Sequence, residues 1–495
     1  MTLRLTNKNY NWIRAGIWLI YCLYLLVVFY TVDSFDLKVG ALLSGLLIEL
    51  TIISFLRHWK QSRMPYLLDW FRLATFFFVV LNYLGLIWDL DFKTKILVYN
   101  SNYVNSSSAL PSILVLLCGL AALWLGEKLI FSSRNGAIKK KFNPLNQCKK
   151  SKKEILVFRN RKTFHGLVFC VGISQVILIT RGITGYAAIP IGSASVFSVF
   201  IQITNVLNPI LLAILAILVL RYKYNSGRIS FIFKAFLLLQ ILLGFVTGMK
   251  EAILTPLVIV VVPYILTRKK ISNVLILCLA IFAFLLYPVN NTYRTILHES
   301  NNLGRVESVK KAVATTIENG FVENLVTGAE SYQGRLSLFP ILMYSVENEQ
   351  IWTEFKYLNR YIYLPIAWVI PRFLIPNKPT ANSGSILYEI TTGNDTSSIT
   401  PTTYGWSFFE GGLITVFLTF FLFSIFISFI NTKSDVNTMF GLLLYILIMV
   451  DLLKVESDIF FLISGILQTV FLIVIINYLF FKKRTSVYVR NRITI

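Results

Sequence analysis

The chain has 495 residues, of which 56% are hydrophobic and 15% aromatic, and its formal net charge at pH 7 is +23. A soluble globular protein of this length could not bury so much apolar surface, so the composition excludes that class and indicates an integral membrane protein. The positive charge falls in short segments between hydrophobic runs. That placement is typical of a membrane-orientation signal and argues against nucleic-acid binding.

Hydrophobic runs occur along the whole chain. A helix crosses a bilayer core with about 20 mainly apolar residues. The sequence therefore predicts an all-α, polytopic membrane protein with twelve spans, near residues 12–30, 38–56, 66–88, 109–130, 164–181, 196–220, 229–248, 252–267, 271–289, 408–430, 436–454 and 459–481. The first run is too long for a secretory signal and lacks a small-residue cleavage site, so we expect it to remain as a membrane helix.

The placement of lysine and arginine predicts the direction of the spans. The loop 132–163 is the most basic, and shorter basic groups follow the second, sixth and eighth spans and the twelfth. All of them fall on one side if the spans alternate, so the positive-inside rule predicts that both termini are cytoplasmic. The chain then divides into spans 1–9 (1–289), a large extracytoplasmic loop (290–407), spans 10–12 (408–481) and a basic cytoplasmic tail (482–495).

Two parts of the loop 290–407 have a recognisable pattern. Apolar residues recur at helical spacing from Val306 to Ile317, which predicts an amphipathic helix on the membrane surface or over the site. The stretch 361–375 is apolar but short, and Pro365 and Pro371 interrupt it, so we expect a re-entrant or interfacial segment and no thirteenth span. None of the five cysteines lies in the loop, so no disulfide or thiolate metal site is expected there.

Cationic side chains collect in and around this loop. Arginine and lysine near a membrane boundary on the outer side need an anionic partner, and guanidinium groups match phosphate oxygens with two hydrogen bonds. The alternative is that each cation is solvated or paired with a neighbouring acid. The candidates for binding a lipid-borne pyrophosphate are Arg181, Lys250, Arg294, Arg305, Arg335, Arg372 and Lys378.

Two residues are candidates for proton transfer. His298 is the one histidine of the predicted outer side, beside Glu299, and Glu410 lies at the start of the tenth predicted span. Burial would raise the pKa of a carboxyl at the apolar boundary, whereas a helix N-terminus would lower it, and the sequence leaves both possibilities open. Tyr404 and Trp406 end a polar stretch that suits sugar binding, because flat apolar faces stack on sugar rings.

Other charged residues inside the predicted spans have a structural interpretation. Asp69 and Arg72 are three residues apart on one helix, and Asp451 and Lys454 have the same spacing. We expect these residues, and Glu49, to form ion pairs or to lie at helix ends.

Three segments of the late part of the chain form a recognisable series: Ile370-Pro371-Arg372-Phe373-Leu374-Ile375-Pro376-Asn377-Lys378-Pro379, then Thr400-Pro401-Thr402-Thr403-Tyr404-Gly405, then Phe409-Glu410-Gly411-Gly412. In these segments the chain resembles the Wzy-type O-antigen or oligosaccharide repeat-unit polymerases, which are multi-span bacterial enzymes with a large outer loop between late spans. Arg181 and Gly192 match the arginine-x10-glycine motif of some members. The later loop has no perfect copy, because Arg294 to Gly304 is one residue short and Arg372 to Gly384 one residue long.

The resemblance implies a glycosyltransferase that joins polyprenyl-pyrophosphate-linked repeat units on the outer face of the bacterial cytoplasmic membrane. It implies Arg294, His298 and Glu410 as catalytic residues, with the remaining cations, Tyr404 and Trp406 binding substrate. No metal or other cofactor is expected; a chain-length regulator, a flippase and membrane lipids are the implied partners. The alternatives are a ligase that transfers finished glycan to another acceptor, and a flippase or transporter, which commonly shows repeated halves and buried charges.

Overall fold

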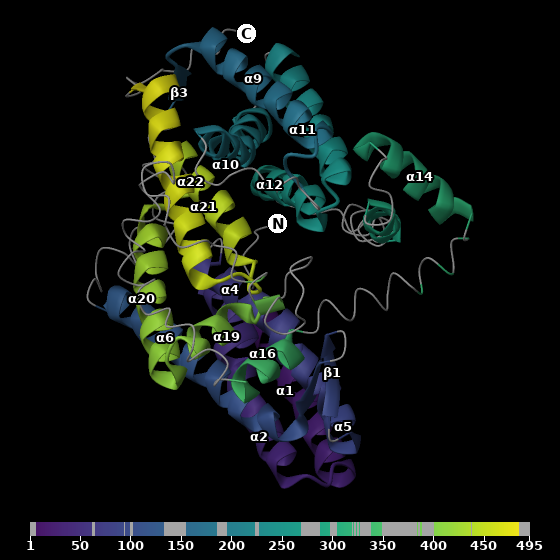
Figure 1. Cartoon of the computed structure of the whole chain (residues 1–495). Coiled ribbons are helices and arrows are strands. Elements are labelled where there is room, and N and C mark those ends of the chain that lie inside the picture. Colours follow the sequence, from purple (N-terminus) through teal and green to yellow (C-terminus); the bar gives the residue numbers. More distant parts are fainter. Residues whose placement is uncertain are drawn as a thin grey trace.

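The computed structural model consists of long helices joined by short turns, with a few short strands (Figure 1). It describes residues 6–61, 65–93, 95–99, 102–132, 155–185, 196–222, 227–268, 288–297, 304–318, 320, 323, 326, 338–348, 384, 387–388, 400–436 and 438–484. Within these residues nine helices are long and apolar enough to cross a membrane, and two more apolar helices are shorter. The largely helical membrane fold predicted from the sequence is confirmed at this level.

The first part of the chain forms four long helical runs and a hairpin. Two of the runs contain a π-helical segment, η1 and η2, that continues from one α-helix into the next, and η3 is a 3-10 turn. The elements are α1 (Asn7–Thr31), α2 (Phe35–Ile48), η1 (Glu49–Ile53), α3 (Ser54–Gln61), α4 (Leu67–Thr75), η2 (Phe76–Val80), α5 (Leu81–Phe92), β1 (Lys95–Tyr99), β2 (Asn102–Asn105), η3 (Ser106–Ser108) and α6 (Ala109–Ser132).

The second part begins with a strand and ends with its partner. The π-helical η4 continues α10, and residues 288–297 are also helical. The elements are β3 (Ile155–Phe158), α9 (Arg161–Thr180), α10 (Val196–Ala216), η4 (Ile217–Arg221), α11 (Gly227–Thr247), α12 (Lys250–Arg268), α14 (Arg305–Glu318), α16 (Phe339–Glu347), α19 (Thr402–Phe409), α20 (Gly412–Lys433), α21 (Met439–Leu452), α22 (Ile459–Phe480) and β4 (Phe481–Arg484).

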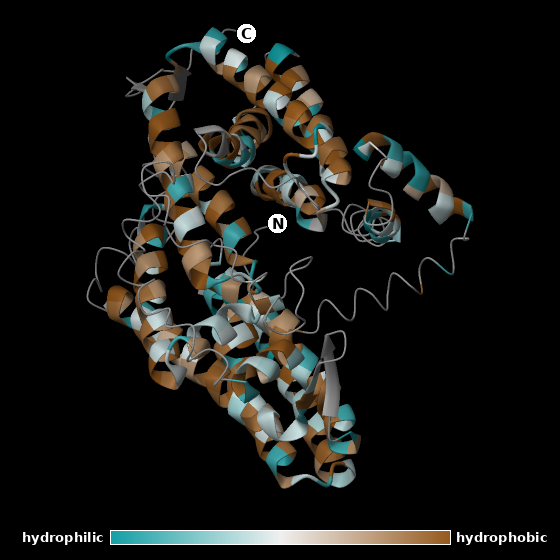
Figure 2. Ribbon diagram, in the orientation of Figure 1, coloured by the Kyte–Doolittle hydropathy of each residue, from teal (hydrophilic) through white to brown (hydrophobic). Residues whose placement is uncertain are grey.

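Eleven of the twelve predicted spans coincide with apolar helices of the described residues, including the short helices α12 and α21. The other, 271–289, lies outside the described residues except for its last two. One boundary was wrong: the run 408–430 is not one helix, because α19 ends at Phe409 and α20 begins at Gly412. Hydrophobic residues cover the long helices on several sides (Figure 2), as expected for helices that face both lipid and one another.

The most extensive contact between two helices is that of α6 with α20, and small residues let the two helices approach closely. A Cβ atom on Gly126 of α6 would lie 2.7 Å from the backbone oxygen of Phe421, and one on Gly119 would lie 2.7 Å from the ring of Tyr404. The Ser424 hydroxyl donates to the Leu123 carbonyl at 2.6 Å. Close backbone approach at small residues is how membrane helices associate without a hydrophobic driving force.

We expect Gly126→Ala to destabilise the folded protein by about 1–3 kcal/mol, because the added methyl group must push the α20 backbone away. The midpoint of thermal unfolding in detergent measures this. The control is Gly16→Ala in α1, where a Cβ would meet nothing within 4 Å. Equal unfolding midpoints for the two variants would contradict the close packing of α6 on α20.

Two short helices from the predicted outer loop lie inside the bundle. The first, α16, packs against η2 and α6, and its backbone N–H groups at Leu338 and Phe339 donate to the Phe78 carbonyl and the Asn82 side chain at 3.3 Å each. The second, α19, is buried along its whole length between α6, α16 and α20. The re-entrant segment predicted at 361–375 lies outside the described residues. Among the described residues of the predicted loop, α16 and α19 are short helices that pack against the long ones.

The two ends of the bundle can be told apart by contacts. At one end β3 pairs with β4, with Phe158 opposite Phe481, so the segment before α9 and the segment after α22 lie together. At the other end α11 turns into α12, and Lys454 after α21 forms an ion pair with Glu251 at 2.8 Å. We call these the strand end and the turn end of the bundle.

Candidate functional site

The helix α19 begins with an unusual backbone conformation. Thr402 has φ = 66°, the one described non-glycine residue with positive φ. A β-branched residue rarely adopts this conformation, and such strain is held in place only by strong surrounding contacts. The Thr402 hydroxyl accepts a hydrogen bond from the Gly405 N–H at 3.1 Å. The neighbouring Thr403 hydroxyl donates to the Val455 carbonyl at 2.8 Å and contacts the Ser457 carbonyl at 2.9 Å, which fixes α19 to the loop after α21.

Tyr404 and Trp406 lie in the core and not on an exposed sugar-stacking surface. Tyr404 is fully buried, stacks on Phe420 with ring centroids 4.5 Å apart and shares a 3.2 Å hydrogen bond with the Thr75 hydroxyl of α4. Trp406 is also buried, against Phe409. The polar composition of the preceding stretch is also typical of a solvated loop, whereas α19 is buried against α6, α16 and α20. Sugar binding by Tyr404 and Trp406 stays a prediction.

Glu410 is buried at the carboxyl end of α19, in the turn to α20. Gly412 has φ = 67° and so provides the left-handed residue that the sharp turn requires. A Cβ on Gly411 would clash with the Thr415 hydroxyl, so the turn leaves no room for a side chain there. The sequence analysis placed Glu410 at the start of a long span; the structure instead places its carboxylate between two helices, two residues before α20 begins.

Three of the predicted cations gather at the turn end around the carboxyl terminus of α11. Arg294 donates from Nε to the Gly248 carbonyl at 2.8 Å, and Nη1 of the buried Arg305 lies 3.5 Å from the Val246 carbonyl. Arg181 is the C-cap residue of α9 and is exposed. Gly185 follows four residues later, and a Cβ atom added to Gly185 would lie 2.7 Å from Arg305 Nη1. Guanidinium groups are stabilised there because the last carbonyls of a helix carry partial negative charge.

Tyr293 belongs to the same group. Its hydroxyl donates to the Val246 carbonyl at 2.7 Å. Burial raises the pKa of the Tyr293 phenol, and the neighbouring Arg305 opposes that shift. We call Arg181, Arg294 and Arg305 the arginine group. Its members come from three separate segments of the chain.

Ion pairs and a hydrogen bond connect the turn between α11 and α12 with α19. Glu251 follows the α11–α12 turn, and its carboxylate pairs with Lys454, which also pairs with Asp451 at 3.0 Å. Burial alone would lower the pKa of Lys454, but Asp451 and Glu251 raise it above its ordinary value, so the ammonium stays charged. Val455 directly follows Lys454, and the Val455 carbonyl accepts the hydrogen bond from the Thr403 hydroxyl. The turn between α11 and α12 is therefore linked through Lys454 to the loop that holds the start of α19.

The remaining predicted site residues cannot be placed. Lys250 is the first residue of α12, beside Glu251, but its side chain lies outside the described residues. His298, Arg335, Arg372 and Lys378 also lie outside the described residues. Their roles as base and as phosphate-binding groups stay predictions.

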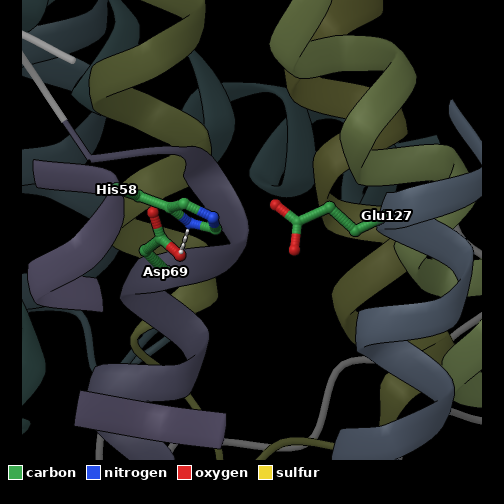
Figure 3. A group of neighbouring side chains, drawn as sticks. All are labelled: His58, Asp69 and Glu127. Carbon is green, nitrogen blue, oxygen red and sulfur yellow. Dashed lines mark hydrogen bonds and ion pairs between the residues drawn. The ribbon is translucent and has the colours of Figure 1, made fainter. Parts of the chain in front are cut away.

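A second polar group was missed by the sequence analysis. Asp69 Oδ1 contacts His58 Nδ1 at 2.8 Å and Arg72 Nη1 at 3.0 Å, while Arg72 Nη2 donates to Glu127 Oε2 at 2.5 Å. The side chains of Arg72 and Glu127 are 1% and 7% exposed. Figure 3 shows the Glu127 carboxylate facing His58 and Asp69 from the opposite side of the group. The Asp69–Arg72 pair was predicted, and so was Asp451–Lys454; both are confirmed.

His58, Asp69 and Glu127 are close enough to share a cation, because their ligand atoms lie within 4.8 Å of one another. The bridging guanidinium of Arg72 already supplies positive charge between the two carboxylates. We therefore interpret these four residues as an ion-pair network that joins α3, α4 and α6. A signal was present in the sequence: Glu127 is an acid within a predicted span, and such residues normally have a partner.

The comparison with protein families gives one match. The family model described as domain of unknown function (DUF8712) matches residues 153–487, which is about two thirds of the 495-residue chain and begins just before β3. The matched region contains the arginine group and α19, whereas the ion-pair network lies before it. No curated protein and no solved structure matches the chain.

Proposed function

We propose a function from the site itself, since the chain belongs to the DUF8712 family, which is described as a domain of unknown function. The protein is a polysaccharide polymerase, a glycosyltransferase that joins polyprenyl-pyrophosphate-linked oligosaccharide repeat units into a long surface glycan. It works on the outer face of the bacterial cytoplasmic membrane. The observation that carries the proposal is the arginine group, because Arg294 and Arg305 both reach carbonyls at the end of α11, and Arg181 is the C-cap residue of α9 four residues before Gly185, which lies beside Arg305.

The chemistry requires such a group. A hydroxyl of the acceptor repeat unit attacks the anomeric carbon of the donor, a new glycosidic bond forms, and the bond to the lipid pyrophosphate breaks. The leaving pyrophosphate gains negative charge, which guanidinium groups stabilise through paired hydrogen bonds. The attacking hydroxyl loses its proton to a general base. Glu410 and His298 are the candidates for this base, and Arg181, Arg294 and Arg305 bind the pyrophosphate.

The location of the arginine group also supports a lipid-linked substrate. It surrounds the ends of α9 and α11, two helices of membrane-spanning length and apolarity. The pyrophosphate of a polyprenyl lipid lies at the end of its hydrocarbon chain, so it reaches the bilayer surface where such helices end. A soluble sugar nucleotide would not need a site at this depth.

The proposed orientation of the protein in the membrane follows from the basic residues at the strand end. The pairing of β3 with β4 places the residues directly before α9 beside those directly after α22, and Arg159, Lys482 and Lys483 are among these residues. The positive-inside rule assigns that end to the cytoplasm. The turn end, with the arginine group, is then extracytoplasmic, and both termini are cytoplasmic.

Deletion of the protein should leave cells that make and translocate lipid-linked single repeat units but assemble no long chains. The size distribution of lipid-linked glycans, resolved on gels and by mass spectrometry, measures this. Purified protein with lipid-linked repeat units in vesicles should then restore long chains without nucleotide sugar. Long lipid-linked chains that stay untransferred after deletion would identify a ligase instead, and the polymerase proposal would be wrong.

One observation favours a transporter or flippase as the second candidate. Charged residues buried within spans often mark an ion or substrate path, and the ion-pair network lies between three spans. Its charges are paired with one another, which favours the structural interpretation. The deletion strain separates these functions, because loss of a flippase would trap single repeat units on the cytoplasmic face.

A further inference from the structure

The helix α14 (Arg305–Glu318) has three different faces. Its residues follow a helical spacing of 3.6, so positions seven and eleven apart share a face. One face is buried, one is exposed and apolar, and one is exposed and polar. The buried face packs on the protein, so the other two faces need two further environments, one apolar and one aqueous.

The buried face fixes α14 to the turn end of the bundle. Arg305, Ser308 and Ala312 are buried, and Ala312 packs with Tyr293 and Ile296 of the helical residues 288–297. Arg305 reaches the Val246 carbonyl at the end of α11, and α14 contacts α11. The helix is therefore held at the point where a membrane-spanning candidate ends.

The exposed apolar face consists of Val306, Val313 and Ile317, which are 49%, 39% and 74% exposed. Lys310 lies between them on the same side of the helix and is also exposed. Exposed β-branched residues in line on one helix face indicate an apolar environment outside the protein. A lysine among them fits a membrane surface, because its stem can lie on apolar ground while the ammonium reaches phosphate groups.

The exposed polar face lies beside the apolar one. Glu307, Lys311 and Glu318 share this face and are exposed. Side chains of both charges on one exposed face suit water. The helix therefore presents an apolar and a charged side to two different surroundings.

The surroundings of α14 identify what covers the apolar face. Leu242 on α11, Met249 in the turn and Leu254 on α12 are 54%, 44% and 42% exposed. Leu242 belongs to a helix of membrane-spanning length, so lipid covers it. Exposed apolar residues therefore lie on α11, in the turn and on α12, and α14 packs against α11.

We propose that α14 is an interfacial helix whose Val306, Val313 and Ile317 face enters the phospholipid layer. Lys310 then lies at anionic headgroups, and the charged face lies in water. This is the arrangement of amphipathic helices that lie in the plane of a membrane. Because Arg305 begins α14, the interfacial helix also fixes the height of this arginine relative to lipid phosphates. The membrane contact stands whether or not the protein is a polymerase.

Collision measurements with spin labels test the proposal on the full chain. Single nitroxides are introduced through Val313→Cys and Ile317→Cys, and matched ones through Glu307→Cys and Glu318→Cys, with the native cysteines replaced by serine. The protein is reconstituted in vesicles of phosphatidylethanolamine and phosphatidylglycerol. Labels at 313 and 317 should collide several times more often with oxygen, relative to a water-soluble nickel chelate, than labels at 307 and 318.

Two results would overturn the proposal. Equal ratios at all four positions would place the apolar face in water, and protection of 313 and 317 from both reagents would place it against protein. A photoreactive benzophenone residue at position 317 in the otherwise unchanged chain provides a second test that needs no cysteine replacement. Its crosslinks should be to phospholipid, detected by mass spectrometry, and a crosslink to a second copy or to another protein would contradict the membrane contact.

Discussion

Replacing Arg72 with leucine should destabilise the folded protein by about 3–5 kcal/mol, because two buried carboxylates would lose the cation between them. Arg72 bridges Asp69 and Glu127, and its side chain is 1% exposed, so water cannot replace the guanidinium. The midpoint of thermal unfolding in detergent, together with the amount of protein in the membrane, measures the effect. Arg72→Lys should give an intermediate loss, because one ammonium cannot reach both carboxylates in the planar two-point geometry.

The matched control for this network is the exposed pair of Lys93 with Asp89 at the other end of the same span, where the side chains are 62% and 56% exposed. Lys93→Ala should change the stability by at most about 1 kcal/mol, because solvent screens such pairs. The double variant Arg72→Met, Glu127→Leu should be more stable than Arg72→Leu alone, since it removes the Glu127 carboxylate that Arg72 pairs with, while Asp69 keeps its contact with His58. Near-equal stability of Arg72→Leu and Lys93→Ala would contradict the buried network.

The spans were predictable because each one needs a minimum apolar length. Even α21, with 14 residues, was placed correctly from its composition, and it is buried on nearly all sides. Long-range partners were not predictable in this way. Arg72 and Asp69 are neighbours on one helix turn, so their pairing follows from spacing, but Glu127 is 55 residues from Arg72. Its role depends on how α6 packs against α4, which periodicity does not specify.

The insertion of α19 shows why the site was only partly predictable. The residues Trp406 to Phe409 are apolar and precede an apolar span, so hydrophobicity alone joins them to it. The division depends on two glycines and on the left-handed conformation of Gly412. The paired glycines after Glu410 were visible in the sequence, but whether they open a helix or separate two depends on the packing of α19 against α6 and α16.

Substitutions in the arginine group should have the second large effect, a loss of polymerisation rate. Arg294→Lys and Arg305→Lys should each lower the polymerisation rate by roughly ten- to hundred-fold, since a charge-assisted hydrogen bond to a phosphate contributes about 1.5–3 kcal/mol. Lysine keeps the charge but loses the planar, two-point contact with phosphate oxygens. The rate of chain growth from lipid-linked repeat units, per molecule of folded protein, measures the loss. Arg181→Lys should behave in the same way, because Arg181 is the exposed member of the group.

The control for this experiment is an arginine at the opposite end of α11. Arg228 is exposed in the first turn of α11, at the far end from Gly248, so Arg228→Lys should leave the rate unchanged. Arg294 and Arg305 also satisfy carbonyl groups at the end of α11, and a purely structural role would lower the unfolding midpoint without changing the rate of the folded fraction. Full chain growth by all three variants at equal folded amounts would remove the arginine group from the reaction, whereas a loss confined to this group places pyrophosphate at the end of α11.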